Sequence, residues 1–176
     1  MVPKKPKLIP HPTISQPVSK AKHMDKSYKE YLEALYSSIA WSKFIDFYEP
    51  DDTALSGYEI TLGPTGFLKR DVFPSLMISS KLPREQINNW MMKCLEAATI
   101  SNECYLYLRL GPWAHIEILD ITKWLVFVWG MKISETNNVV GEILLLNSDK
   151  SKILFLCDKG EVIEVYISGL DSDVNQ

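Results

Sequence analysis

His115 is the residue best suited to acid and base chemistry, because it is the only histidine outside residues 1–24. An imidazole exchanges protons near neutral pH, and Glu117 follows it by two positions. Residues two apart in a strand project from the same face, so the two side chains can act together. We therefore take His115 and Glu117 as the catalytic candidates if the protein is a small enzyme. An exposed, solvated cluster on a sheet explains the same residues without catalysis.

Other kinds of reactive site find little support in the sequence. A serine or cysteine nucleophile needs a histidine base, and Cys104 is expected on the strand face opposite His115. Metal sites need convergent ligands, but no HxH, HExxH or CxxC spacing occurs. We therefore expect no metal and no cofactor. The odd set of Cys94, Cys104 and Cys157 predicts reduced thiols in a cytoplasmic protein.

A β-hairpin over residues 104–119 is expected to position these side chains. Apolar residues alternate with polar or aromatic ones on both sides of Gly111, so one face of the hairpin is wholly apolar. A three-residue loop over residues 111–113 keeps the two faces unmixed, which favours this register. The predicted pairs are Leu110 with Ala114, Leu108 with Ile116, Leu106 with Ile118, Arg109 with His115, and Tyr107 with Glu117.

The second face of this hairpin gathers side chains that are typical of protein interfaces. Tyrosine, tryptophan and arginine are enriched in interface hot spots, and an acidic rim suits a basic partner. The predicted partner-binding residues are Tyr105, Tyr107, Arg109, Trp113, His115, Glu117, Glu161 and Glu164. The alternative is that a further layer, such as the first helix, covers this face as core.

The distribution of charge favours a basic protein as the partner. The formal net charge is −3, but residues 1–24 hold five lysines and no acidic residue. Residues 25–176 therefore carry 14 basic against 22 acidic residues, a net charge of −8. Such a domain repels a phosphate backbone, so nucleic acid is not expected to bind the folded part. The lysine-rich segment leaves open a separate contact with an acidic surface or nucleic acid.

A single domain is expected between two polar tails. Residues 1–24 contain five prolines among lysine and serine, which predicts an extended tail. His23-Met24 before Asp25 resembles a cloning junction or an internal start, so the origin of this tail is open. Residues 25–170 form the domain, and residues 171–176 are a polar, acidic tail. No apolar run approaches the roughly 20 residues of a membrane-spanning helix.

Apolar periodicity predicts two amphipathic helices. The first runs over residues 27–48 and opens with a capping box from Ser27 to Glu30. The second runs over residues 83–98, with a proline in its first turn. Residues 121–133 fit either a helix opened by Asp120 or a buried strand, and their β-branched and aromatic content favours the strand.

The remaining elements are strands, and the fold class is α+β. The expected architecture is a mainly antiparallel sheet of roughly six to eight strands, a β-meander in its C-terminal half, with the two helices packed on it. The last hairpin has a loop over residues 158–160 and pairs Phe155 with Ile163 and Ile153 with Val165. Further strands are expected at residues 58–62, 76–78, 139–146, 153–157 and 161–167.

These patterns together predict a non-enzymatic, cytoplasmic protein-binding module. Its acidic surface would engage or neutralise a basic protein, as an immunity or inhibitor protein or an adaptor does. The alternative is the small enzyme that uses His115 with Glu117 as acid and base.

Overall fold

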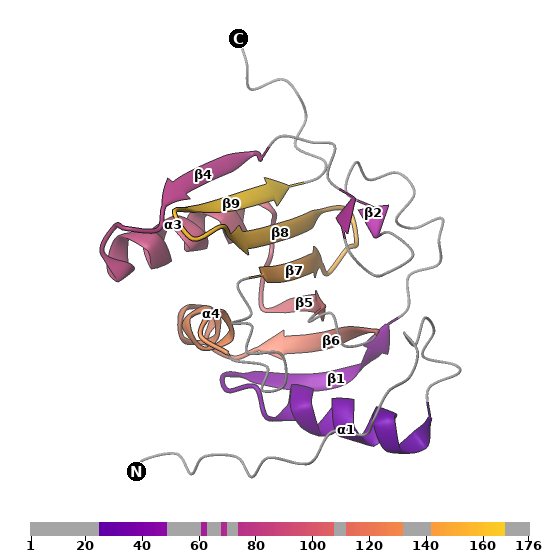
Figure 1. The fold of residues 1–176 in the computed structure, drawn as a ribbon. Coiled ribbons are helices and arrows are strands. Elements are labelled where there is room, and N and C mark those ends of the chain that lie inside the picture. The colour runs from indigo at the N-terminus through magenta and orange to yellow at the C-terminus, as the bar shows by residue number, and fades with distance from the viewer. Residues whose placement is uncertain are drawn as a thin grey trace, which may run out of the picture.

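A computed structural model describes residues 25–48, 61–62, 68–69, 74–107, 112–131 and 142–167 of the chain. Its main element is a seven-stranded antiparallel sheet with the order β1-β6-β5-β7-β8-β9-β4, and Figure 1 shows these strands stacked from β4 at the top to β1 at the bottom. The predicted α+β class and antiparallel sheet are therefore confirmed. The predictions for residues 1–24, 58–60, 108–111, 132–133, 139–141 and 168–176 lie outside the described residues.

The described residues form three helices, one main sheet and a separate two-stranded ribbon, β2-β3. The helices are α1 (Lys26–Ser37), α3 (Arg84–Ala97) and α4 (Ile121–Trp129). The strands of the main sheet are β1 (Ser42–Tyr48), β4 (Leu76–Ser79), β5 (Glu103–Tyr107), β6 (Trp113–Ile118), β7 (Glu142–Asn147), β8 (Ile153–Asp158) and β9 (Val162–Ile167). The ribbon consists of β2 (Thr61–Leu62) and β3 (Leu68–Lys69).

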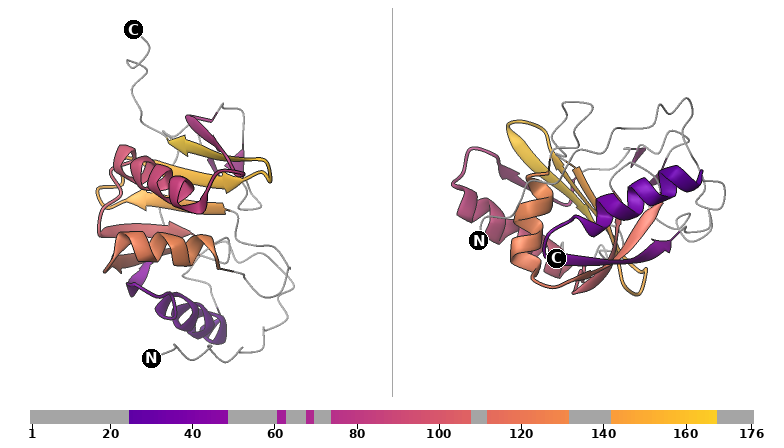
Figure 2. Two further views of the ribbon diagram at one scale, coloured as in Figure 1. Left: turned by 90° about the vertical axis from the view of Figure 1, so that its left-hand side faces the viewer. Right: turned by 90° about the horizontal axis from the view of Figure 1, so that it is seen from below.

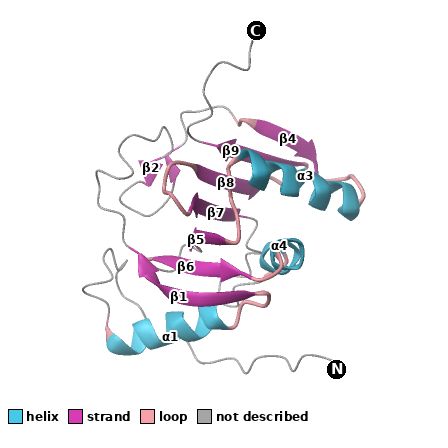
Figure 3. Cartoon of the chain, turned by 180° about the vertical axis from the view of Figure 1, so that it is seen from behind, coloured by secondary structure: helices cyan, strands magenta, loops and turns pink. Residues whose placement is uncertain are grey.

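The principal core lies between the helices and one face of the sheet. In the left view of Figure 2, α3 and α4 lie in front of the strands, and Figure 3 shows from behind that α3 lies over β8 and β9. Tyr28, Leu32 and Tyr36 recur every four residues, which places them on the buried side of α1. Leu106 and Ile116 meet the helices from the sheet, and both are fully buried. The apolar face predicted for the hairpin is thus the helix-covered face.

A second, smaller cluster lies on the opposite face of the sheet. Its members come mainly from β5, β6, β7 and β8, so these central strands are buried on both sides. The buried residues of this cluster are Tyr105, Trp113, Leu144, Leu146, Ile153, Phe155, Cys157 and Tyr166, with Tyr48 and Tyr107 packed beside them. Aromatic side chains of the hairpin's second face therefore contribute to core as well as to surface.

The helix predicted over residues 27–48 is wrong in its second half. Helix α1 ends at Ser37, and Trp41 has a φ of 67°, a left-handed conformation that turns the chain into β1. The predicted capping box is also absent, since Ser27 Oγ donates to Asp25 Oδ2 and Asp25 flanks the helix. Phe44 and Phe47 still reach the principal core, because a strand with one bulge presents them on the same face as a helix would.

The strand favoured for residues 121–133 is also wrong, because residues 121–129 form α4. Asp120 is the N-cap, and its carboxylate accepts a hydrogen bond from the Lys123 backbone N–H at 3.0 Å. The residues that fit the helical pattern, Trp124 and Val128 among them, are buried. Local capping and one-sided burial outweigh the β-propensity of this segment.

Helix α3 and the C-terminal meander of β7, β8 and β9 agree with prediction, but both hairpin registers differ from it. In β5-β6, Leu106 pairs with Ala114 and Tyr105 with His115, a shift of four residues from the predicted register. An even shift leaves every side chain on its predicted face.

The β8-β9 register is shifted by an odd number of residues, which changes the faces that meet. Phe155 pairs with Tyr166 in place of Ile163, so Ile163 lies on the helix-covered face and Phe155 on the opposite one. The turn is tighter than predicted: Lys159 N–H donates to Val162 O at 2.9 Å across Gly160 and Glu161. Gly160 has a φ of 90°, which a two-residue hairpin turn of this kind requires at its first position.

Candidate functional site

Three neighbouring strands position the candidate site on the face opposite the helices. Asp46 of β1 pairs with His115 of β6, and His115 pairs with Tyr105 of β5. One step along the strands, Lys43 pairs with Glu117. Residues in register across a sheet share a face, so the three strands collect these side chains on one surface.

A β-bulge in β1 makes this arrangement possible. The register between β1 and β6 shifts between Phe44 and Asp46, which leaves Ile45 as the extra residue. Ile45 is exposed, whereas Phe44 packs against the principal core. The bulge therefore lets Phe44 and Phe47 both face the core while Asp46 projects towards His115.

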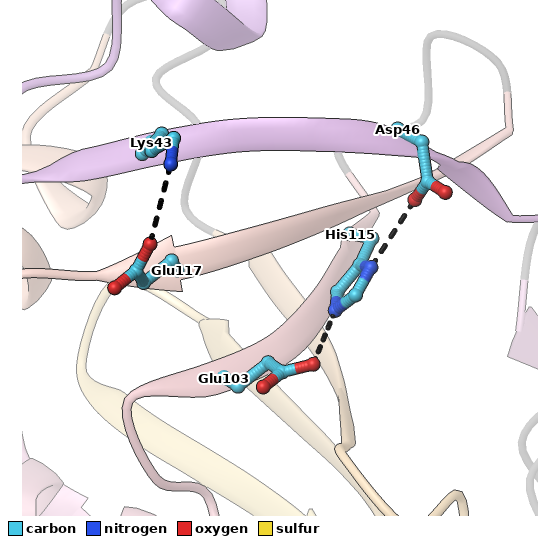
Figure 4. Close-up of polar contacts among 5 residues, drawn as sticks. All are labelled: Lys43, Asp46, Glu103, His115 and Glu117. Atoms are coloured by element: carbon cyan, nitrogen blue, oxygen red, sulfur yellow. Dashed lines mark hydrogen bonds and ion pairs between the residues drawn. The ribbon is translucent and has the colours of Figure 1, made fainter.

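His115 lies between two carboxylates, one at each ring nitrogen. Its Nδ1 is 3.2 Å from Asp46 Oδ1 and its Nε2 is 2.7 Å from Glu103 Oε1 (Figure 4). The imidazole side chain is 17% exposed, while the Asp46 and Glu103 side chains are 66% and 58% exposed. The imidazole is therefore largely buried, whereas the two carboxylates that contact it are exposed to solvent.

Aromatic rings support the imidazole from the interior. The Tyr105 ring stacks on His115 with centroids 4.7 Å apart and an interplanar angle of 24°. The Tyr48 ring packs in turn against the Tyr105 ring, with their centroids 4.8 Å apart. Stacking fixes the plane of the imidazole, and the two carboxylates fix its rotation in that plane.

Glu117 is not the carboxylate that contacts His115. Its Oε2 lies 3.7 Å from Lys43 Nζ, and Figure 4 shows this pair farther along the strands than the His115 cluster. Sequence reasoning missed Asp46, because residues 42–48 were assigned to a helix, and it did not connect Glu103 with His115. The β-branched and aromatic content of Ser42–Tyr48 is the signal that favours a strand there.

The structure does not bring all the predicted contact residues together. Tyr105 and Trp113 are buried, and the Tyr107 ring packs 5.4 Å from that of Trp113. Arg109 lies outside the described residues. Glu161 and Glu164 lie towards the other edge of the sheet, because β5, β7 and β8 separate β9 and its turn from β6. Four strand spacings correspond to about 19 Å, too far for one compact acidic rim.

Glu161 and Glu164 also have partners of their own. Glu161 Oε1 lies 3.2 Å from Lys81 Nζ, and Glu164 Oε2 accepts a hydrogen bond from Tyr166 O–H at 2.8 Å. Asp46 and Glu103 remain beside the imidazole, and Glu117 lies on the same face at the next such position of β6. We call these three residues and His115 the carboxylate–imidazole cluster.

All three cysteines of the chain are buried. Burial raises the pKa of Cys94 to about 12, and burial with the nearby Glu103 carboxylate raises the pKa of Cys104 to about 12. Cys104 faces the helix-covered core, opposite His115, as predicted. A thiolate at either position is therefore disfavoured near neutral pH, which argues against a cysteine nucleophile.

Metal coordination and membrane insertion find no support within the described ranges. No group of three or more histidine, cysteine, aspartate or glutamate side chains there has the geometry to hold a metal ion. Asp46 and Glu103 approach opposite edges of the imidazole and so do not converge on one point. None of the helices in the described part of the chain is long and apolar enough to cross a membrane.

Comparison of the chain with protein-family models, curated proteins and solved structures found no match. The function must therefore be argued from the site itself.

Proposed function

We propose that the protein is a non-enzymatic, acidic binding module that engages or neutralises a basic protein partner. The observation that carries this proposal is the pair of exposed carboxylates, Asp46 and Glu103, that flank His115 on the sheet face opposite the helices. Together with Glu117 they place three acidic groups within three adjacent strands, where Lys43 pairs with Glu117 and Lys150 lies over the neighbouring Tyr48 and Tyr105 rings.

An acidic surface raises the association rate of a basic partner and orients it as it approaches, which supports this proposal. A negative surface draws a cationic partner towards it and penalises acidic competitors. Asp46 and Glu103 are held by contacts with a stacked imidazole, so they lose little conformational freedom when a partner binds. A partner's lysine or arginine side chain can meet carboxylate oxygens there without a rearrangement of the strands.

The acid-base enzyme is the second candidate, supported by the carboxylates at both ring nitrogens of His115. Such contacts orient a catalytic imidazole. They also occupy both nitrogens, however, so a substrate would have to displace Asp46 or Glu103 before a proton could move. The low exposure of the imidazole adds to this difficulty. We therefore favour binding, in a reducing cytoplasm that suits the buried thiols of Cys94 and Cys104.

The test compares two variants of the full chain that remove equal charge. The first carries Asp46→Asn, Glu103→Gln and Glu117→Gln in the cluster. The matched control carries Glu30→Gln, Glu33→Gln and Glu85→Gln on α1 and α3. Each is used with the wild type to capture proteins from lysate, and captured proteins are then titrated by calorimetry at low and high salt.

The proposal expects a basic protein whose affinity falls by about tenfold or more in the cluster variant at low salt and much less in the control. The difference between the variants should shrink at high salt. Equal affinities for both variants would contradict the proposal. If no basic protein is captured, a screen for hydrolase and transferase activity with His115→Ala as the control tests the second candidate.

A further inference from the structure

The turn between β7 and β8 holds Lys150 in an unusual backbone conformation. Lys150 has a φ of 63°, where glycine is favoured and a lysine is strained. Its N–H donates to Asn147 O at 2.9 Å, and the Asn147 N–H donates to Lys152 O at 3.1 Å, which closes the turn around it.

A buried asparagine makes this turn rigid. Asn147 is 1% exposed, and its side-chain Oδ1 accepts hydrogen bonds from the N–H groups of Ser151 and Lys152, each at 2.9 Å. Its Nδ2 donates to Thr99 Oγ1 at 2.7 Å, which ties the turn to the segment after α3. The backbone of Lys150 is therefore fixed, and its side chain leaves the turn in a set direction.

The Lys150 side chain ends over two tyrosine rings beside the carboxylate–imidazole cluster. Its Nζ lies 4.4 Å from the ring centroid of Tyr48 and 5.3 Å from that of Tyr105. Both distances lie within the range of a cation–π contact, in which the negative face of the ring attracts an ammonium. Tyr105 in turn stacks on His115, so rings, imidazole and carboxylates form one continuous layer.

The geometry points to a cation-binding subsite on the faces of Tyr48 and Tyr105, which Lys150 occupies in the free protein and which a lysine side chain of the basic partner takes over. Lys150 shows that an alkylammonium fits these two rings. Asp46 and Glu103 lie next to them and supply the negative potential that an incoming ammonium needs. The identity of the partner rests on the proposed function, whereas the subsite can be tested without it.

Lys150 acts in this arrangement as an internal competitor. A cation–π contact of an exposed lysine favours its position over the rings by about two- to fivefold, so Lys150 is easily displaced. Its presence lowers the apparent affinity for another ammonium by a comparable factor. Removing the ammonium should therefore tighten binding of a lysine side chain. Removing an ammonium elsewhere on the surface should change only the general electrostatic attraction.

The first experiment uses the full chain and the probe Nα-acetyl-lysine N-methylamide. Aromatic NMR spectra of wild type, Lys150→Met and the control Lys159→Met are recorded with the probe or with sodium chloride at equal ionic strength. We expect the Tyr48 and Tyr105 ring signals to differ from wild type only in Lys150→Met, and the probe to return them towards their wild-type positions in a saturable way. If the probe shifts the Tyr48 and Tyr105 ring signals of Lys150→Met no more than sodium chloride does, the proposed subsite is wrong.

The second experiment measures affinity for a captured basic protein. Lys150→Met should bind the basic protein about two- to fivefold more tightly than Lys159→Met does. Both variants lack one positive charge, but only Lys150→Met removes the ammonium that covers the Tyr48 and Tyr105 rings. Adding Tyr48→Leu should abolish this gain, and Tyr48→Phe should retain it. Equal affinity of the two lysine variants would overturn the subsite and leave the proposed function standing. If no basic protein binds, the proposed function fails, and the probe experiment still decides the subsite.

Discussion

His115 and Asp46 face each other across the paired strands β6 and β1, with Nδ1 and Oδ1 3.2 Å apart. Glu103 Oε1 contacts the other ring nitrogen at 2.7 Å. A neutral imidazole carries one N–H and can donate to only one of these carboxylates, whereas the charged form donates to both. Side-chain contacts through one ring therefore link β1, β6 and β5 in addition to the backbone hydrogen bonds of the sheet.

Replacing His115 by alanine should lower the free energy of unfolding by about 1–2 kcal/mol. The variant loses the two polar contacts and the stacking on Tyr105, but the exposure of both carboxylates limits the electrostatic part. Urea denaturation at neutral pH measures this change. Lys43→Ala, which breaks the exposed pair with Glu117, is the control and should cost less than about 0.5 kcal/mol. Equal effects of the two substitutions would contradict the role given to His115.

Deleting Ile45 should leave a folded protein with the His115 cluster intact. Ile45 is the extra residue of the bulge, and without it Phe44, Asp46 and Phe47 still alternate between the two faces. We expect the free energy of unfolding to change by less than about 1.5 kcal/mol, because Ile45 is exposed. Deletion of Phe47 should be much more damaging, since it removes a ring from the principal core. Thermal unfolding and amide NMR spectra distinguish the two deletions.

The Asp120 cap of α4 should give a pH-dependent contribution to stability. Hydrogen bonds from the Lys123 backbone and side chain lower the pKa of Asp120 below its ordinary value. A lowered pKa in the folded state means that this stabilisation is present above the unfolded pKa of about 3.9 and is lost as the pH falls through the folded value. Asp120→Ala should therefore destabilise the protein at pH 7 more than at pH 3.

Asp120→Asn is the matched control for this effect. Asparagine also caps a helix, but it does not titrate, so it should keep part of the stabilisation without the acid-dependent loss. Urea denaturation of the wild type and both variants at the two pH values makes the comparison. An Asp120→Ala effect that is the same at pH 7 and pH 3 would contradict the proposed role of the carboxylate.

Cys94 and Cys104 should react very slowly with thiol reagents in the native protein. Their pKa values of about 12 leave a thiolate fraction at pH 8 that is roughly a thousandfold below that of an ordinary cysteine. Labelling with iodoacetamide, followed by mass spectrometry of the peptides, measures each site. Full labelling within minutes in denaturant is the control, and comparably fast labelling of either site in native protein would contradict the burial described here.

The local sequence pattern was sufficient to predict those elements whose pattern fits only one kind of secondary structure. Helix α3 followed from a single apolar stripe behind a proline, and the meander of β7, β8 and β9 from short apolar strands with turn residues between them. The two faces of the β5-β6 hairpin were also predictable, because alternation places Leu106 and Ile116 opposite His115 whatever even register the strands adopt.

Patterns with two solutions required information from the rest of the fold. Phe44 and Phe47 lie on one side of a helix, but they also lie on one side of a strand that contains a bulge, so residues 42–48 could not be assigned locally. Residues 121–129 follow Asp120, which can cap a helix, but their apolar content also fits a strand, and burial of one side against the sheet decides for the helix.

The sequence by itself determined the α+β class, the antiparallel meander, and the separation of His115 from the thiol of Cys104. Only the tertiary structure decided that Asp46 and Glu103 contact His115 and that Lys150 covers Tyr48 and Tyr105. The physical reason is that periodicity is a property of neighbouring residues, whereas these contacts depend on the pairing of distant strands. That pairing is set by the lengths of turns and by one bulge, which alternation alone does not specify.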